Sequence, residues 1–86
     1  MPEISRFFGI IIRMFFDDHN PPHFHVEYSG RKAVFDLRGN ILQGDLRSKV
    51  AVRLVRDWID LHSSELEADW KLAKQGKPLK KISPLE

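Results

Sequence analysis

Hydrophobic residues fill the first part of the chain on both of its alternating sides. From Ile4 to Phe16 they are mostly β-branched or aromatic, and such a pattern predicts a long strand that is covered on both faces. Gly9 within this run marks a bend or a bulge. The next residues, 17–22, include two aspartates, an asparagine and two consecutive prolines. They predict a turn, because Asp and Asn bond their own backbone and proline has no N–H to give to a sheet.

The segment after this turn alternates strictly between apolar and polar residues. Phe24, Val26 and Tyr28 fall on one side of it. His23 and His25 fall on the other side. The alternation predicts a strand with one apolar and one polar face, so that both strand histidines point the same way.

Two further strand signals follow. Ser29-Gly30 suits a tight hairpin turn, and residues 33–37 alternate again as a third strand. Residues 41–46 are short enough to form either an edge strand or an extended connection, and we interpret them as a strand.

The spacing of the apolar residues changes to that of a helix from Arg47 onward, which predicts a helix over residues 47–75. Either Ser48 or Asp45 caps its start. Without a break this helix would be roughly 40 Å long at about 1.5 Å per residue. That length is large for so short a chain, and a capping-box pattern begins at Ser64. We therefore expect a kink or a break near Ser63.

Together these elements predict one α+β domain over residues 1–86. It comprises a small antiparallel β-meander of three to four strands within residues 4–46, followed by a long or kinked C-terminal helix packed on one face of the sheet. The basic tail, residues 77–86, is more apolar than a free tail needs to be. We expect it to dock on the sheet or on a partner. Its apolar residues are Leu79, Ile82 and Leu85.

Composition narrows the chemistry. The chain has no cysteine, so disulfides and thiolate metal sites are excluded and a metal would be held by imidazole, carboxylate or backbone oxygen. The net charge is +2, with lysines crowding the C-terminal end; this permits a polyanionic partner without requiring one. The apolar run from Phe7 to Phe16 contains Arg13, lacks a cleavage pattern and is too short to cross a bilayer. We expect a cytoplasmic protein with no membrane partner.

The clearest chemical signal is the histidine-rich turn at residues 17–25. Three of the four histidines lie within seven residues, and imidazole either binds a metal ion or exchanges protons near neutral pH. One interpretation is a divalent metal such as zinc, held by His19, His23, His25 and Asp18. A second is metal-free acid/base or phosphate-contacting chemistry. A third is that these are half-exposed strand residues bonded to the neighbouring acids.

Two other positions bear on this cluster. Arg13 lies on the expected first strand and would suit a phosphodiester, with the guanidinium gripping phosphate while histidine moves protons. The alternative is a solvated, charged face of the sheet. His62 lies on the apolar side of the expected helix, where a lone histidine is more often a hydrogen-bonded core residue than a ligand. It would face the cluster only if the helix packs across the sheet.

Three segments of the chain resemble a known family. They are Met-Pro-Glu-Ile-Ser-Arg-Phe-Phe-Gly-Ile at residues 1–10, Asp-His-Asn-Pro-Pro-His-Phe-His-Val at residues 18–26, and Pro-Leu-Lys-Lys-Ile at residues 78–82. The chain is similar over nearly its whole length to the small bacterial family catalogued as domain of unknown function 4160. The resemblance implies a stand-alone bacterial protein encoded beside another short protein, an arrangement like that of toxin–antitoxin pairs.

Competing functions follow from these patterns. The first is a ribonuclease-type toxin, in which His23 and His25 are acid and base, His19 is an orienter or third ligand, and Arg13 contacts phosphate. The second is a non-catalytic module that binds a cognate small protein, RNA or DNA and uses the histidines as a structural metal clip. A weaker third is a metal sensor. The sequence does not specify the oligomeric state, the substrate or the metal.

Overall fold

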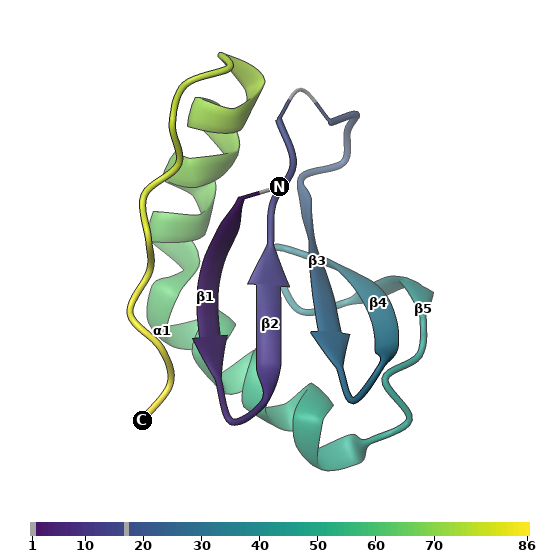
Figure 1. The fold of residues 1–86 in the computed structure, drawn as a ribbon. Coiled ribbons are helices and arrows are strands. Elements are labelled where there is room, and N and C mark those ends of the chain that lie inside the picture. The colour runs from purple at the N-terminus through teal and green to yellow at the C-terminus, as the bar shows by residue number, and fades with distance from the viewer. Residues whose placement is uncertain (1, 17) are drawn as a thin grey trace.

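The computed structural model describes residues 2–16 and 18–86, which form a twisted antiparallel sheet and one long helix (Figure 1). The strands pair in sequence order, so the sheet is a simple meander. This confirms the predicted α+β fold, with five strands instead of three to four. The elements are β1 (Glu3–Phe7), β2 (Ile10–Arg13), β3 (His23–Tyr28), β4 (Arg31–Asp36), β5 (Ile41–Gly44) and α1 (Lys49–Lys74).

The expected single strand from Ile4 to Phe16 is wrong, because the chain reverses in its middle. Phe7 pairs with Ile10, and the two residues between them form a hairpin turn with positive φ angles of 49° at Phe8 and 80° at Gly9. Glycine adopts such angles freely, whereas for a residue with a Cβ the left-handed conformation costs roughly 1–2 kcal/mol of conformational free energy. The apolar Phe8 hides this turn in the sequence, since Asn or Asp usually stands there.

The other predicted turn and edge strand are confirmed. Ser29 and Gly30 form the two-residue turn between β3 and β4, again with positive φ angles. β5 pairs with β4 through an irregular register at Val34. The two strands approach closely at Gly44, where a Cβ would collide with the backbone oxygen of Lys32. A side chain at that position would therefore push β5 away from the sheet.

The core lies between the helix and one face of the sheet. Trp58 of α1 packs against the ring of Phe7 at 5.6 Å and against the ring of Phe24 at 6.0 Å. The apolar side chains on this face of the sheet are fully buried, and they include Ile10, Ile12, Val26 and Phe35. The opposite face is not covered by the helix and carries the partly exposed side chains of Arg13, His25 and Glu27.

The helix begins and bends where the sequence indicates. Ser48 caps it, and its hydroxyl accepts the backbone N–H of Ala51 at 3.1 Å. The helical geometry is interrupted at His62, which has φ −128° and ψ 22°. This confirms the kink expected near Ser63. None of the helical residues in the described chain forms a stretch apolar enough to cross a membrane.

The tail after α1 docks on the domain, as its apolar residues suggest. In Figure 1 it runs back alongside β1. The N–H of Ile82 donates to the carbonyl of Ile4 at 2.8 Å, and the indole N–H of Trp58 donates to the carbonyl of Ser83 at 2.9 Å. Ile82 is buried. The tail thus covers the outer edge of β1 and closes one side of the core.

Candidate functional site

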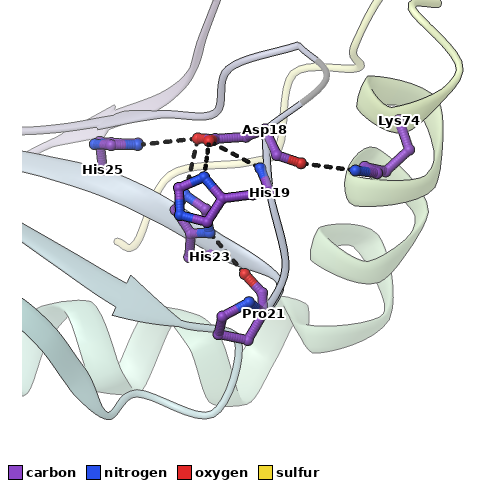
Figure 2. A network of polar contacts seen from close by, with 6 residues as sticks. All are labelled: Asp18, His19, Pro21, His23, His25 and Lys74. Carbon is purple, nitrogen blue, oxygen red and sulfur yellow. Dashed lines mark hydrogen bonds and ion pairs between the residues drawn. The ribbon is translucent and has the colours of Figure 1, made fainter.

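The histidine-rich segment connects β2 to β3 at the end of the sheet that lies beside the C-terminal end of α1 (Figure 1). His23 and His25 lie on β3 and their ring centroids are 5.4 Å apart. They therefore share a face of the strand, as the alternation predicts. Asp18 lies on the connecting loop and points at both rings (Figure 2).

Asp18 is the centre of the cluster. Its Oδ2 atom lies 2.8 Å from Nε2 of His23 and 3.5 Å from Nε2 of His25. Its other oxygen, Oδ1, accepts the backbone N–H of His19 at 3.0 Å. Partial burial acts to raise the pKa of Asp18, but the hydrogen bonds from these groups and the charge of His23 hold it below its ordinary value. Asp18 is therefore a carboxylate at neutral pH.

His23 is fixed at both of its ring nitrogens. Its Nδ1 lies 2.7 Å from the backbone oxygen of Pro21. A carbonyl oxygen only accepts, so Nδ1 carries the hydrogen and donates it. The ring is buried, and its centroid is 5.4 Å from that of Trp70 on α1. This arrangement leaves only Nε2 to face Asp18 and His25.

His25 is the more open of the two strand histidines. Its side chain is 34% exposed, and its ring packs against Phe15 with the centroids 4.3 Å apart. Burial lowers the pKa of His25 below its ordinary value; the bond to Asp18 opposes this effect without cancelling it. The neutral ring, which has a free nitrogen lone pair, is favoured as a result.

The helix holds the loop in place from the other side. The ammonium group of Lys74 donates to the backbone oxygen of Asp18 at 2.8 Å (Figure 2). It also lies 5.8 Å from the ring centre of Trp70. Sequence reasoning missed Lys74, which is separated from Asp18 by 56 positions. No local pattern could have identified it, because it looks like an ordinary lysine in the last turn of a helix.

Three ligand atoms of the cluster are close enough to bind one metal ion. One from each of Asp18, His23 and His25 lie within 4.8 Å of one another. In a tetrahedral zinc site with bonds of about 2.0–2.1 Å, neighbouring ligand atoms are roughly 3.3 Å apart. The two distances measured from Asp18, 2.8 Å and 3.5 Å, bracket that spacing. This spacing is therefore geometrically compatible with one bound metal ion.

The remaining histidines lie outside this group of three. His19 is 86% exposed, and its Nδ1 lies 3.2 Å from Oδ1 of Asp18, the oxygen turned away from His23. Its ring centroid is 5.5 Å from that of His23. His62 bonds to Glu65 at 2.6 Å and packs on Trp58, so the structure does not bring it to the cluster. Asp17, which also flanks the histidines in sequence, lies outside the described residues.

Arg13 lies beside His25 on the uncovered face of the sheet. The strand registers align Arg13, His25, Val34 and Gln43 in one row across β2, β3, β4 and β5. These four residues line a shallow hollow together with Phe15, Lys32 and others. The guanidinium of Arg13 bonds to Glu27 at 2.9 Å. The hollow therefore leads from the cluster across the sheet and contains two cations and one carboxylate.

A comparison with protein families identifies a match for this chain. The family described as Domain of unknown function (DUF4160) matches residues 9–71. This range includes the whole cluster, β2 to β5 and most of α1. No curated protein and no solved structure matches the chain.

Proposed function

Since the chain belongs to the family described as Domain of unknown function (DUF4160), its function has to be argued from the site, and we propose that it binds a divalent transition metal. Zinc is the first choice, with Asp18, His23 and His25 as ligands. The proposed use of the metal is hydrolysis of a phosphodiester, the ribonuclease-like chemistry of a toxin in a toxin–antitoxin pair.

The observation that carries the proposal is the state of His23. Its Nδ1–H is held by the carbonyl of Pro21, and metal-binding histidines usually donate their second nitrogen in this way, which fixes the ring for coordination through the first. The Nε2 atom faces Asp18 and His25 and not the solvent, and a metal ion would replace the proton through which it bonds to Asp18. Because His23 is buried, it has poor access to a large substrate. A ligand suits this environment better than a proton shuttle does.

The number of ligands supports a reactive centre over a closed structural one. Structural zinc sites usually have four protein ligands, whereas catalytic sites have three and leave a position open. Asp18, His23 and His25 supply three. A zinc ion would add Lewis acidity toward water and a phosphate oxygen. His25 is the half-exposed ligand and borders the hollow on the sheet, which is where a substrate would enter.

Arg13 is the proposed phosphate contact in this hollow. Guanidinium has five N–H donors, and Glu27 occupies one amino group of Arg13 at 2.9 Å. Other donors remain for a phosphate oxygen on the same row of the sheet as His25. Lys32 lines the hollow as a second cation.

Metal analysis tests the first step. The purified protein should contain close to one equivalent of zinc or a similar metal per chain, and the His23→Ala/His25→Ala double variant should contain none. His62→Gln is the matched control, since it removes a histidine outside the cluster. Equal metal content in the wild type and the double variant would overturn the site.

RNA cleavage tests the second step. The zinc-loaded protein should cleave single-stranded RNA, and Arg13→Ala should slow cleavage by at least about 10-fold while the metal stays bound. Metal binding with intact RNA would instead favour a non-catalytic role.

One observation favours this second candidate function. Asp18 is held by Lys74 and connects the loop to β3. A metal bound there would therefore fix the loop to the sheet. Zinc would then raise the Tm without any cleavage.

A further inference from the structure

The two edges of the sheet differ in whether another segment of the chain bonds to them. At the β1 edge the tail supplies a backbone hydrogen bond from Ile82 to Ile4. At the β5 edge the described residues offer no equivalent. The backbone hydrogen bonds of β5 and of its flanking residues Asn40 and Asp45 go to β4. Every second residue of an edge strand directs its N–H and C=O groups away from the sheet. The outer side of β5 is therefore open to another strand.

β5 lacks two of the features that commonly guard such an edge, and in the described chain its protection comes only from its short length and its irregular register with β4. Its residues are Ile-Leu-Gln-Gly and all four are exposed. Ile41 is 39% exposed and Leu42 is 47% exposed. Natural edge strands are usually protected by charged residues or proline, and the strand contains neither. An uncharged, partly apolar edge is a suitable template for strand addition.

A basic hollow adjoins this edge at Ile41. It is lined by the start of β5, the connection after β5 and the first turns of α1, and it contains four cations and one carboxylate, Asp45. Arg56 donates to the carbonyl of Gly39. The other three cations have no carboxylate partner within 4 Å in the described part of the chain. They are Arg47, Lys49 and Arg53.

We propose that β5 binds an extended acidic peptide segment of a partner protein. The segment would add a sixth strand through backbone hydrogen bonds and place acidic side chains in the basic hollow. The charges argue against a second copy of this chain, because β5 is only about 13 Å long and two copies would bring their unpaired cations close together. A nucleic acid would use the cations but not the backbone groups or the apolar side chains of the edge. This proposal is independent of the metal centre.

Fluorescence anisotropy with the full-length protein provides the test. The probe is a short labelled peptide in which glutamate and valine alternate. We expect saturable binding, and binding at least about tenfold weaker for the same peptide with alternate backbone nitrogens methylated, since that peptide keeps its charge but cannot pair as a strand. Amide hydrogen exchange should slow in β5 when the unmodified peptide is added.

Charge-reversal variants localise the site. Lys49→Glu/Arg53→Glu should weaken binding of the peptide at least about tenfold. Lys71→Glu/Lys77→Glu changes the net charge equally at the far end of α1 and should bind like the wild type. All four residues are exposed, and circular dichroism checks that both variants fold.

Four results would overturn the proposal. These are no binding of the acidic peptide, equal binding of the methylated peptide, equal losses in the two charge-reversal variants, and self-association through β5 in sedimentation experiments. A single-stranded RNA that binds the basic hollow without protecting the β5 amides, where the acidic peptide does not bind, would assign the surface to nucleic acid instead.

Discussion

Asp18 and Asp69 are two carboxylates that are partly or fully shielded from water, and their surroundings shift their pKa values in opposite directions. Asp69 is almost completely buried on α1. One of its oxygens accepts the backbone N–H of Lys80 at 3.0 Å, and the other has no partner among the described residues. Burial raises the pKa of Asp69, and the single donor does not reverse this effect. Asp18 is less buried and has three N–H groups around it, which lower its pKa.

The difference between them shows what makes a carboxylate available to a cation. Burial alone favours the neutral acid, as at Asp69. Donors that converge on a partly buried carboxylate favour the anion, as at Asp18, and two of these donors are imidazoles that can exchange a proton for a metal ion. The number and type of neighbouring groups therefore distinguish Asp18, a candidate metal ligand, from Asp69, a buried carboxylate that lacks such neighbours.

The largest expected effect is the loss of metal from Asp18→Asn. The amide keeps the size of the side chain but removes its charge. We expect the zinc affinity to fall by at least about 100-fold, since loss of an outer-shell partner alone typically costs 10- to 100-fold. Competition with a coloured chelator measures this affinity. Asp69→Asn makes the same chemical change outside the cluster and should bind zinc like the wild type; equal losses in both variants would contradict the assignment.

Asp69→Asn should stabilise the protein. It removes a poorly compensated buried charge, since an unpaired buried polar group costs about 1–3 kcal/mol and more when it is charged, while the amide keeps a polar atom at the unpartnered position. For a chain of this size each 1 kcal/mol corresponds to roughly 4–8 °C in Tm. Calorimetry at pH 7 should therefore show a Tm several degrees above that of the wild type. A lower Tm would mean that the charge of Asp69 has a partner that offsets its burial.

The pH dependence of stability should separate the two carboxylates further. The folded pKa of Asp69 is raised above 3.8, so its contribution to stability is greatest below that value and is lost as the pH rises through the folded pKa. The folded pKa of Asp18 is lowered below 3.8, so its contribution is present above that value and is lost as the pH falls through the folded pKa.

Thermal denaturation of the metal-free variants at a series of pH values measures both effects. On acidification from pH 7, the gain in Tm from Asp69→Asn should disappear first. The loss in Tm from Asp18→Ala should persist to lower pH and then disappear. The reverse order would show that the directions of the two pKa shifts are wrong.

The smallest expected effect is at Lys74. Lys74→Met keeps the aliphatic part of the side chain and removes the hydrogen bond to the backbone of Asp18. One such bond contributes about 0.5–1.5 kcal/mol, which corresponds to about a 2- to 10-fold loss of zinc affinity. Lys71→Met, one turn away on the same helix, should have no effect in the same chelator assay.

The two β-hairpin turns show how much of the fold the sequence reveals. Ser29-Gly30 and Phe8-Gly9 have the same backbone shape, with positive φ at both residues. Ser29-Gly30 follows an alternating strand and precedes the polar residues Arg31 and Lys32, so the sequence alone indicates this turn. Phe8-Gly9 lies inside a continuous apolar run. Phe8 is exposed there and adopts a left-handed backbone conformation that is unfavourable for a residue with a Cβ. Local propensity points to a strand there, and only the pairing of β1 with β2 overrides it.

The candidate site divides in a similar way. Strand periodicity places His23 and His25 on one face, and the structure has their rings 5.4 Å apart. The anchoring of His23 by Pro21 and of Asp18 by Lys74 could not be read from the sequence. The first depends on the exact path of the loop, and the second on how a kinked helix crosses the end of the sheet. Neither leaves a periodic or compositional signal.

The positions of the two tryptophans give the protein separate optical reporters. Trp70 packs against His23, so its fluorescence should change when that imidazole is protonated or binds a metal. Trp58 donates to the carbonyl of Ser83, so its emission should shift when the tail leaves β1 and water reaches the indole. Replacing either one with phenylalanine would leave a single fluorophore, and ligand binding at the loop could then be followed apart from undocking of the tail without an added label.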